Sequence, residues 1–201
     1  MHNLPVIRYT ELKKESELSV THYFAAIPVP FQVVRSQLED LFARYDFQGH
    51  YKAIPHHDDL HITLHFFGAL TAEELKAVKQ ALRETAAGFA PMTLGIGGLS
   101  YFGNPAGPRV VYLSVDENRS LSELYTKSGE ALADVLKKPL RQPYVPHVTI
   151  AKKTIDGRPL KIAKEQFPAL HVSAGSVTLF RIEPSSSPKY IPEDVFPFGN
   201  G

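Results

Sequence analysis

The chain contains no cysteine among its 201 residues. Disulfide bonds, thiolate nucleophiles and cysteine-ligated zinc sites are therefore excluded, and the composition fits a reducing compartment. No run of about 18 apolar residues suggests a membrane span, and the segment from Met1 to Pro5 lacks the apolar core of a secretory signal. We therefore expect a cytoplasmic protein with no membrane partner.

A large excess of one charge is also missing. Lysine and arginine number 22 and aspartate and glutamate 21, which gives a formal net charge of +1. Proteins that bind nucleic acid without sequence preference use a broad basic surface to neutralise many phosphates. The balanced charge argues against such a surface, but it is compatible with a small, localised anion site.

What the sequence does contain is a repeated motif of the form His, apolar, Thr, apolar. The first copy is His61-Ile62-Thr63-Leu64 and the second is His147-Val148-Thr149-Ile150, 86 positions later (147 − 61). In an extended strand, successive side chains point to opposite faces. Each copy therefore predicts a strand with an imidazole and a hydroxyl on one face and two aliphatic side chains on the other.

Around these copies, the pattern of apolar residues predicts two loosely similar halves. We expect an N-terminal extension over residues 1–20 and one bilobal α+β domain over residues 21–201, with both motif strands facing one cleft. A capping box at Thr71 and Glu74 predicts the start of one helix. Strands are expected at 22–27, 60–68, 92–99, 109–115, 147–153, 175–182 and 189–196, helices at 31–45, 71–88 and 120–136, a loop at 101–108, and a connector rich in lysine and proline before residue 175.

The two motifs and their flanking residues resemble the 2H phosphoesterase superfamily and, more narrowly, the bacterial RNA 2′,3′-cyclic phosphodiesterases, long called 2′-5′ RNA ligases. The flanking matches are Tyr23 to Ile27 with Pro28 and Pro30, Phe66-Phe67-Gly68, and Pro143 to Pro146. The resemblance spans about residues 22–182. It implies a bilobal, pseudo-twofold (ligase T-like) fold in which two antiparallel sheets line a central groove and helices lie outside. It also implies metal-independent hydrolysis of a 2′,3′-cyclic phosphate at an RNA or oligonucleotide end to a 2′-phosphate, without a cofactor, and in some members reversible joining of 2′-5′ linkages.

The chemistry of that reaction suits the repeated residues. Opening a cyclic phosphodiester in line needs a base on one side of phosphorus and an acid on the other, and imidazole serves either role near neutral pH. We therefore expect His61 and His147 to be catalytic, with Thr63 and Thr149 donating hydrogen bonds to the non-bridging oxygens. The sequence does not determine which histidine is the base.

A third phosphate contact is expected from Lys152, at a position where relatives commonly carry arginine. Lysine keeps the charge but lacks the planar two-pronged geometry of the guanidinium group. Strict alternation along the strand would turn Lys153, rather than Lys152, toward the face of His147. Lys152 reaches the groove only if the strand bulges or ends.

Several other side chains are candidates for weaker roles. Tyr23, Phe24, His65 and Tyr144 are possible substrate contacts, and Tyr101 and Phe102 could also stack on a base. His65 lies on the same ideal strand face as His61 and Thr63. The run His56-His57-Asp58-Asp59 has the composition of a metal site, but because it is contiguous we interpret it as a solvated turn, and we expect no metal.

Two other functions remain open. The groove could hold an RNA end without turning it over, or the enzyme could act on a small cyclic nucleotide phosphate rather than on RNA. ATP-driven ligation is disfavoured, because no phosphate-binding loop is present: Gly95-Ile96-Gly97-Gly98 precedes no helix and lacks the following lysine. The expected partner is RNA with a cyclic phosphate end, and the expected state is a monomer.

Overall fold

The computed structural model describes residues 20–139 and 143–199, so the extension expected over residues 1–20 lies outside the described residues except for its last one. None of the described helices is long and apolar enough to cross a membrane. The helices are α1 (Phe31–Arg44), α2 (Phe47–His50), the short 3-10 helix η1 (His57–Asp59), α3 (Ala72–Ala87) and α4 (Arg119–Leu136). The strands are β1 (His22–Pro28), β2 (Tyr51–Ala53), β3 (His61–Ala69), β4 (Met92–Asn104), β5 (Gly107–Val115), β6 (His147–Thr154), β7 (Glu165–Ala174), β8 (Ser176–Ile182) and β9 (Tyr190–Pro197).

The strands form one antiparallel sheet in the order β7-β4-β5-β6-β3-β1-β8-β9, and β2 pairs with β6. The two motif strands, β3 and β6, are neighbours at the centre but share a single register pair, Ile62 with Val148. The sheet therefore consists of two halves, β7-β4-β5-β6 and β3-β1-β8-β9, joined at that pair. The predicted α+β fold is confirmed, with the two expected sheets connected into one.

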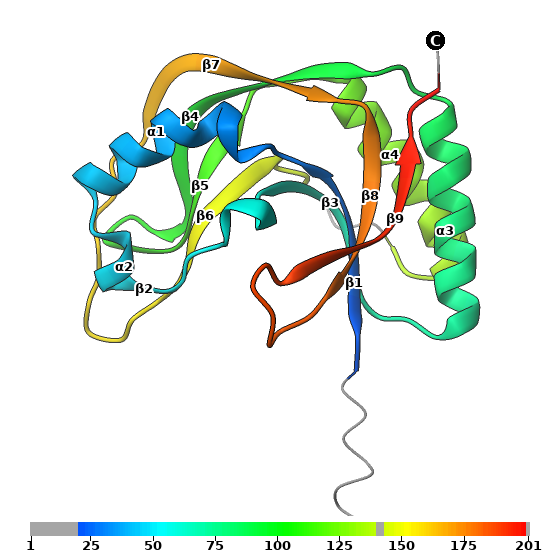
Figure 1. Ribbon diagram of the computed structural model, residues 1–201, viewed down its shortest axis with the longest axis horizontal. Helices are drawn as coiled ribbons and strands as arrows, with labels where there is room; N and C mark the ends of the chain where they lie inside the picture. The colour runs from blue at the N-terminus through cyan, green and yellow to red at the C-terminus, as the bar shows by residue number, and fades with distance from the viewer. Residues whose placement is uncertain (1–19, 140–142, 200–201) are drawn as a thin grey trace, which may run out of the picture.

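The helices cross between the halves. Helix α1 follows β1 in sequence but lies beside β7, where Arg44 donates two hydrogen bonds of 2.9 and 2.6 Å to the carboxylate of Glu165. Helix α4 follows β5 but packs against α3 and β3. Figure 1 shows α3 and α4 outside the half that contains β1, β8 and β9. Helix α1 thus follows a strand of one half and packs on the other half, and α4 does the same in the opposite direction. These two crossings connect the halves.

The two faces of the central strands have different environments, as alternation predicts. Ile62, Leu64, Val148 and Ile150 are buried in the main hydrophobic core. On the opposite face, a second and smaller cluster contains Phe24, Ala26 and Phe180, from β1 and β8. The motif histidines and threonines lie on this second face, so a small aromatic cluster forms the floor beside them.

The local signals at helix ends were accurate. The Thr71 hydroxyl accepts a hydrogen bond of 3.2 Å from the Glu74 N–H, and the Glu74 carboxylate accepts one of 2.8 Å from the Thr71 N–H, so the predicted capping box is present. The exception is α4: its cap was expected at Ser120 but is Asn118, two residues earlier, whose side chain accepts a hydrogen bond from the Leu121 N–H.

Three predictions about connections were wrong. Strand β4 continues to Asn104, so the loop expected at 101–108 is only a tight turn. The connector expected before residue 175 contains β7, an edge strand in which five of the ten residues are exposed and one is Pro168, so it lacks the apolar signal of a central strand. The segment between the helix expected at 31–45 and the strand expected at 60–68, where no element was predicted, contains α2 and β2, which are too short to produce a periodic pattern.

Candidate active site

A β-bulge follows the threonine of each motif. In β3, Thr63 pairs with Ala26 while His65 pairs with Ala25, so Leu64 is the additional residue. In β6, Thr149 pairs with Tyr112 while Ala151 pairs with Val111, so Ile150 is the additional residue. A bulge inserts one residue into the alternation and therefore reverses the face of every later side chain in the strand.

The bulges decide which side chains reach the groove face. Beyond the threonine, Phe66 in β3 and Lys152 in β6 take the position that strict alternation would give to their neighbours. Both line a cavity of about 260 Å³ together with His61, Thr63 and Thr149. Its other lining residues are Phe24, Pro55, Asp59, Ile182 and Tyr190. The sequence expectation for Lys152 depended on such a bulge, and the structure contains it.

Both motif histidines are held by the same hydrogen bond. His61 Nδ1 lies 2.7 Å from the carbonyl oxygen of Asp59, and His147 Nδ1 lies 2.7 Å from the carbonyl oxygen of Val145, in each case two residues earlier. A carbonyl oxygen can only accept, so each Nδ1 carries a proton. In the neutral ring, Nε2 then has a free lone pair for proton transfer.

Aromatic rings fix the plane of each imidazole. The ring of His61 lies 4.9 Å from that of Phe24 and 5.1 Å from that of Tyr190. The ring of His147 lies 5.0 Å from those of Phe102 and Tyr112. The two histidines therefore have equivalent surroundings on the two halves, as a pseudo-twofold arrangement requires.

Burial makes both histidines neutral at pH 7. The pKa of His61 is lowered to about 4, mainly by burial; the hydrogen bond to the Asp59 carbonyl opposes this shift, and the positive charges of Lys152 and of protonated His147 add to it. Burial also lowers the pKa of His147. His147 does not line the cavity described above, but its charge when protonated is one of the smaller causes that lower the pKa of His61.

Asp59 connects His61 to the β8-β9 hairpin. Its side chain is 5% exposed, and its carboxylate accepts hydrogen bonds of 3.0 to 3.1 Å from the N–H groups of Lys189 and Tyr190. The hydroxyl of Tyr190 in turn accepts a hydrogen bond of 3.3 Å from Lys152 Nζ. One buried carboxylate thus positions an aromatic side chain against both His61 and the cavity lysine.

The other predicted contacts separate into two groups. Phe24 lines the cavity, and Phe102 packs on His147. Tyr23 and Tyr101, in contrast, pack against the main core on the reverse face. Tyr144 stacks on Tyr125 with ring centroids 3.8 Å apart, so its expected place at the groove is wrong.

His65 is also misplaced by the sequence prediction, because the bulge at Leu64 turns it to the reverse face. There its Nε2 lies 2.8 Å from the Ser128 hydroxyl, and its ring stacks on Tyr125 at 4.9 Å. Ser128 donates its own proton to the Leu124 carbonyl at 2.6 Å. His65 is therefore a hydrogen-bonded core residue between β3 and α4.

Five residues that line the cavity were not among the predicted site residues: Pro55, Asp59, Phe66, Ile182 and Tyr190. A signal for Phe66 was present, because it follows His61 by five positions as Lys152 follows His147. No local signal marks Asp59 or Tyr190, which meet through contacts between distant parts of the chain.

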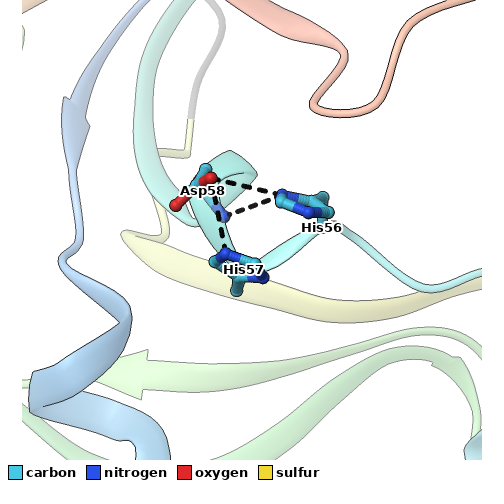
Figure 2. Close-up of side chains that lie close together, drawn as sticks. All are labelled: His56, His57 and Asp58. Carbon is cyan, nitrogen blue, oxygen red and sulfur yellow. Dashed lines mark hydrogen bonds and ion pairs between the residues drawn. The ribbon is translucent and has the colours of Figure 1, made fainter.

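The turn before the first motif brings three potential metal ligands together. The donor atoms of His56, His57 and Asp58 lie within 4.8 Å of one another (Figure 2). The hydrogen bonds of the turn account for this arrangement, because His56 Nδ1 accepts from the Asp58 N–H at 3.2 Å and so has its lone pair occupied. Neither histidine lines the 260 Å³ cavity, so the turn contributes no ligand to the groove.

Comparisons with known proteins agree with this geometry. The family model of the 2′-5′ RNA ligase superfamily matches residues 30–185. The chain is 29% identical over 186 residues to the RNA 2′,3′-cyclic phosphodiesterase of Bacillus subtilis (strain 168), covering 88% of this chain and 95% of that protein. It is 29% identical over 184 residues to the RNA 2′,3′-cyclic phosphodiesterase of Geobacillus stearothermophilus, covering 88% of this chain and 57% of that one.

Solved structures share the fold at lower sequence identity. A crystal structure of a Thermus thermophilus protein superposes with a TM-score of 0.75 and 22% identity, covering 89% of this chain and 98% of that one. A crystal structure of Escherichia coli LigT complexed with 3′-AMP gives a TM-score of 0.72 and 20% identity, with the same coverage.

Proposed function

Because the chain belongs to the 2′-5′ RNA ligase superfamily, we propose that it hydrolyses 2′,3′-cyclic phosphate ends of RNA or oligonucleotides to 2′-phosphates. One observation carries the proposal: two imidazoles, one from each half, have their Nδ1 atoms bonded to backbone carbonyls. Each ring therefore has Nε2 free for proton transfer; His61 lines the 260 Å³ cavity, and His147 is close enough for its positive charge to lower the pKa of His61. The names of the curated relatives support the same reaction.

In the proposed reaction, a water oxygen attacks phosphorus in line with the bond to the ribose 3′ oxygen. One neutral imidazole takes a proton from the water at its Nε2. The other, which has first taken up a proton at Nε2 from solvent, gives that proton to the 3′ oxygen as the P–O3′ bond breaks. The product carries a 3′-hydroxyl and a 2′-phosphate; the first ring then loses its proton to solvent and the second regains one, which restores both rings. Positioned proton transfer of this kind typically contributes about 10²- to 10⁴-fold per group.

The remaining groove residues stabilise the charge on phosphorus. Thr63 and Thr149 donate hydrogen bonds to the non-bridging oxygens from opposite walls, and Lys152 supplies the positive charge. The two imidazoles have matching hydrogen bonds, so the side on which the ribose lies decides which one is the base. A 5′-hydroxyl in the place of water would form a 2′-5′ linkage by the same steps.

Single replacements of the two histidines test the proposal. We expect His61→Ala and His147→Ala each to lower kcat by at least about a hundredfold on an RNA with a 2′,3′-cyclic end, because each removes one proton-transfer group. The matched control is His171→Ala, which changes an exposed histidine on the edge strand β7. The terminal phosphate of the product is identified by phosphatase sensitivity and mass spectrometry.

Two results would contradict the proposal. Turnover retained in both variants would exclude the two-imidazole mechanism. A cyclic-ended RNA that binds tightly to the wild-type protein and is recovered intact would favour an end-binding module instead. The cytoplasmic location and the monomeric state stay predictions.

A further inference from the structure

A second cavity adjoins the first at Lys152. It has a volume of about 310 Å³ and is lined by Phe102, Gly103, Arg109, Val110, Lys152 and Lys153. We call it the basic cavity. Lys152 lines both this cavity and the 260 Å³ cavity of the two motifs, so the two cavities share one lysine side chain.

The backbone of β6 is shaped so that two consecutive lysines reach the basic cavity. In a regular strand, neighbouring side chains point to opposite faces. Lys153 instead has a φ of +62°, a left-handed conformation that is uncommon for residues other than glycine. This conformation directs Lys153 into the cavity that Lys152 already lines. Such local strain often occurs at functional sites.

The charges of the basic cavity are not neutralised by the protein. Among the residues that the structure describes, no carboxylate lies within ion-pair distance of Arg109, Lys152 or Lys153. Exposed arginines elsewhere do find such partners: Arg44 pairs with Asp40 at 2.9 Å, and Arg119 with Glu123 at 2.7 Å. In a chain with a net charge of +1, three unpaired cations around one cavity form a localised anion site.

The basic cavity lies next to the second motif. Phe102 forms one wall of the basic cavity, and its ring stands edge-on to the ring of His147 at 5.0 Å. An anion in the basic cavity would therefore lie beside the ring that packs on His147. Lys152 would separate it from the groove in which the cyclic phosphate is expected.

We propose that the basic cavity binds the phosphodiester that precedes the terminal cyclic phosphate of an RNA chain, with Arg109 and Lys153 as its ligands. This inference rests on the proposed function. Successive phosphates of one strand are separated by a single nucleotide, and the two cavities are neighbours because Lys152 lines both of them. The site makes the enzyme selective for polynucleotide ends over free cyclic mononucleotides, because a mononucleotide has no preceding phosphodiester.

The test compares a trinucleotide and a mononucleotide, both with 2′,3′-cyclic ends. The variants are Arg109→Ala and Lys153→Gly, since glycine accepts the positive φ at that position without strain. We expect each variant to lower kcat/KM for the trinucleotide by about tenfold, as loss of one charge-assisted phosphate contact, and to leave kcat/KM for the mononucleotide unchanged within about twofold. The salt dependence of trinucleotide turnover should also become less steep. Arg119→Ala, an exposed arginine on α4, is the control that should change neither substrate.

Binding gives a readout that does not depend on turnover. The dissociation constants of a trinucleotide 2′-phosphate and a mononucleotide 2′-phosphate are measured for the same proteins by fluorescence competition. Weaker binding of the trinucleotide alone in Arg109→Ala and Lys153→Gly supports the inference, even if the wild-type protein proves to have no hydrolytic activity and the proposed function fails. Equal effects on both ligands, or no effect on either, overturn the inference and leave the proposed function standing.

Discussion

Replacing Lys152 by methionine removes the positive charge from the groove but keeps an apolar stem of similar length. Lys152 is half-buried, donates its hydrogen bond to Tyr190 at 3.3 Å, and lines the cavity with Thr149. At an effective dielectric constant of about 20, a unit charge about 4 Å from a phosphate oxygen contributes roughly 4 kcal/mol. That free energy corresponds to about a thousandfold in rate. Water in this half-buried site weakens the interaction between the charge and the phosphate, so we expect kcat/KM to fall by about 10²- to 10³-fold.

The same substitution should move the titration of one histidine. The charge of Lys152 lowers the pKa of His61, as a smaller contribution than burial, whereas burial alone lowers the pKa of His147. Lys152→Met should therefore raise the pKa of His61 from about 4 toward its ordinary value and leave that of His147 unchanged. Whichever role His61 has, its limb of the pH profile of kcat/KM shifts to higher pH. NMR titration of both imidazoles measures the two pKa values directly.

Lys152→Arg is the matched control. It keeps the charge and adds the two-pronged geometry that suits a phosphate, so we expect kcat/KM at or above the wild-type value and an unchanged pKa of His61. If Lys152→Met instead keeps kcat/KM within about threefold and leaves His61 unchanged, Lys152 lies too far from the reacting phosphate and the bulge in β6 has no catalytic consequence.

Three further predictions concern stability and metals. The pKa of His65 is lowered by burial to about 4 from 6.5. Between these two values the folded state binds fewer protons than the unfolded state, so the stability falls as the pH drops from about 6.5 to about 4, by up to roughly 3 kcal/mol for this group. In urea unfolding at pH 7 and pH 4.5, His65→Gln should lose less stability than the wild type, and an equal loss would contradict a buried neutral imidazole. Asp59→Ala leaves the N–H groups of Lys189 and Tyr190 without their acceptor. We therefore expect the free energy of unfolding to fall by about 2–4 kcal/mol and kcat to fall with it. A urea midpoint equal to that of the wild type would mean that the carboxylate does not stabilise the fold. EDTA should leave turnover unchanged, because the groove supplies imidazoles, hydroxyls and a lysine as phosphate partners; a loss that added zinc restores would assign a function to the His56 turn.

The sequence predicted the parts of this molecule that depend on local patterns. Alternation placed His61 and Thr63 on one face and Ile62 on the other, and the structure agrees. The capping box at Thr71 marked the start of α3 without help from the rest of the chain. In each case the physical cause lies within a few neighbouring residues, so the sequence alone contains it.

What the sequence could not predict is the change of face at each bulge. A bulge is a property of two paired strands. Neither Leu64 nor Ile150 carries a local sequence signal that it will lack a pairing partner on the neighbouring strand. Strict alternation therefore placed His65 in the groove and Phe66 outside, which is the reverse of the structure. Asp59 and Tyr190 escaped notice for a related reason: their contact joins positions 131 residues apart, and no local pattern encodes it.

The two bulges also explain how two strands with the same backbone geometry present different side chains to the groove. Five residues after its histidine, each motif turns a side chain into the groove, and the chain places phenylalanine at one such position and lysine at the other. Phe66 is 51% exposed, unusual for so large an apolar ring. A ring face favours stacking on a base, whereas an ammonium group favours a phosphate. A symmetric pair of imidazoles alone could not orient an asymmetric substrate, so under the proposed function we expect the difference between Phe66 and Lys152 to set the direction of an RNA end in the groove.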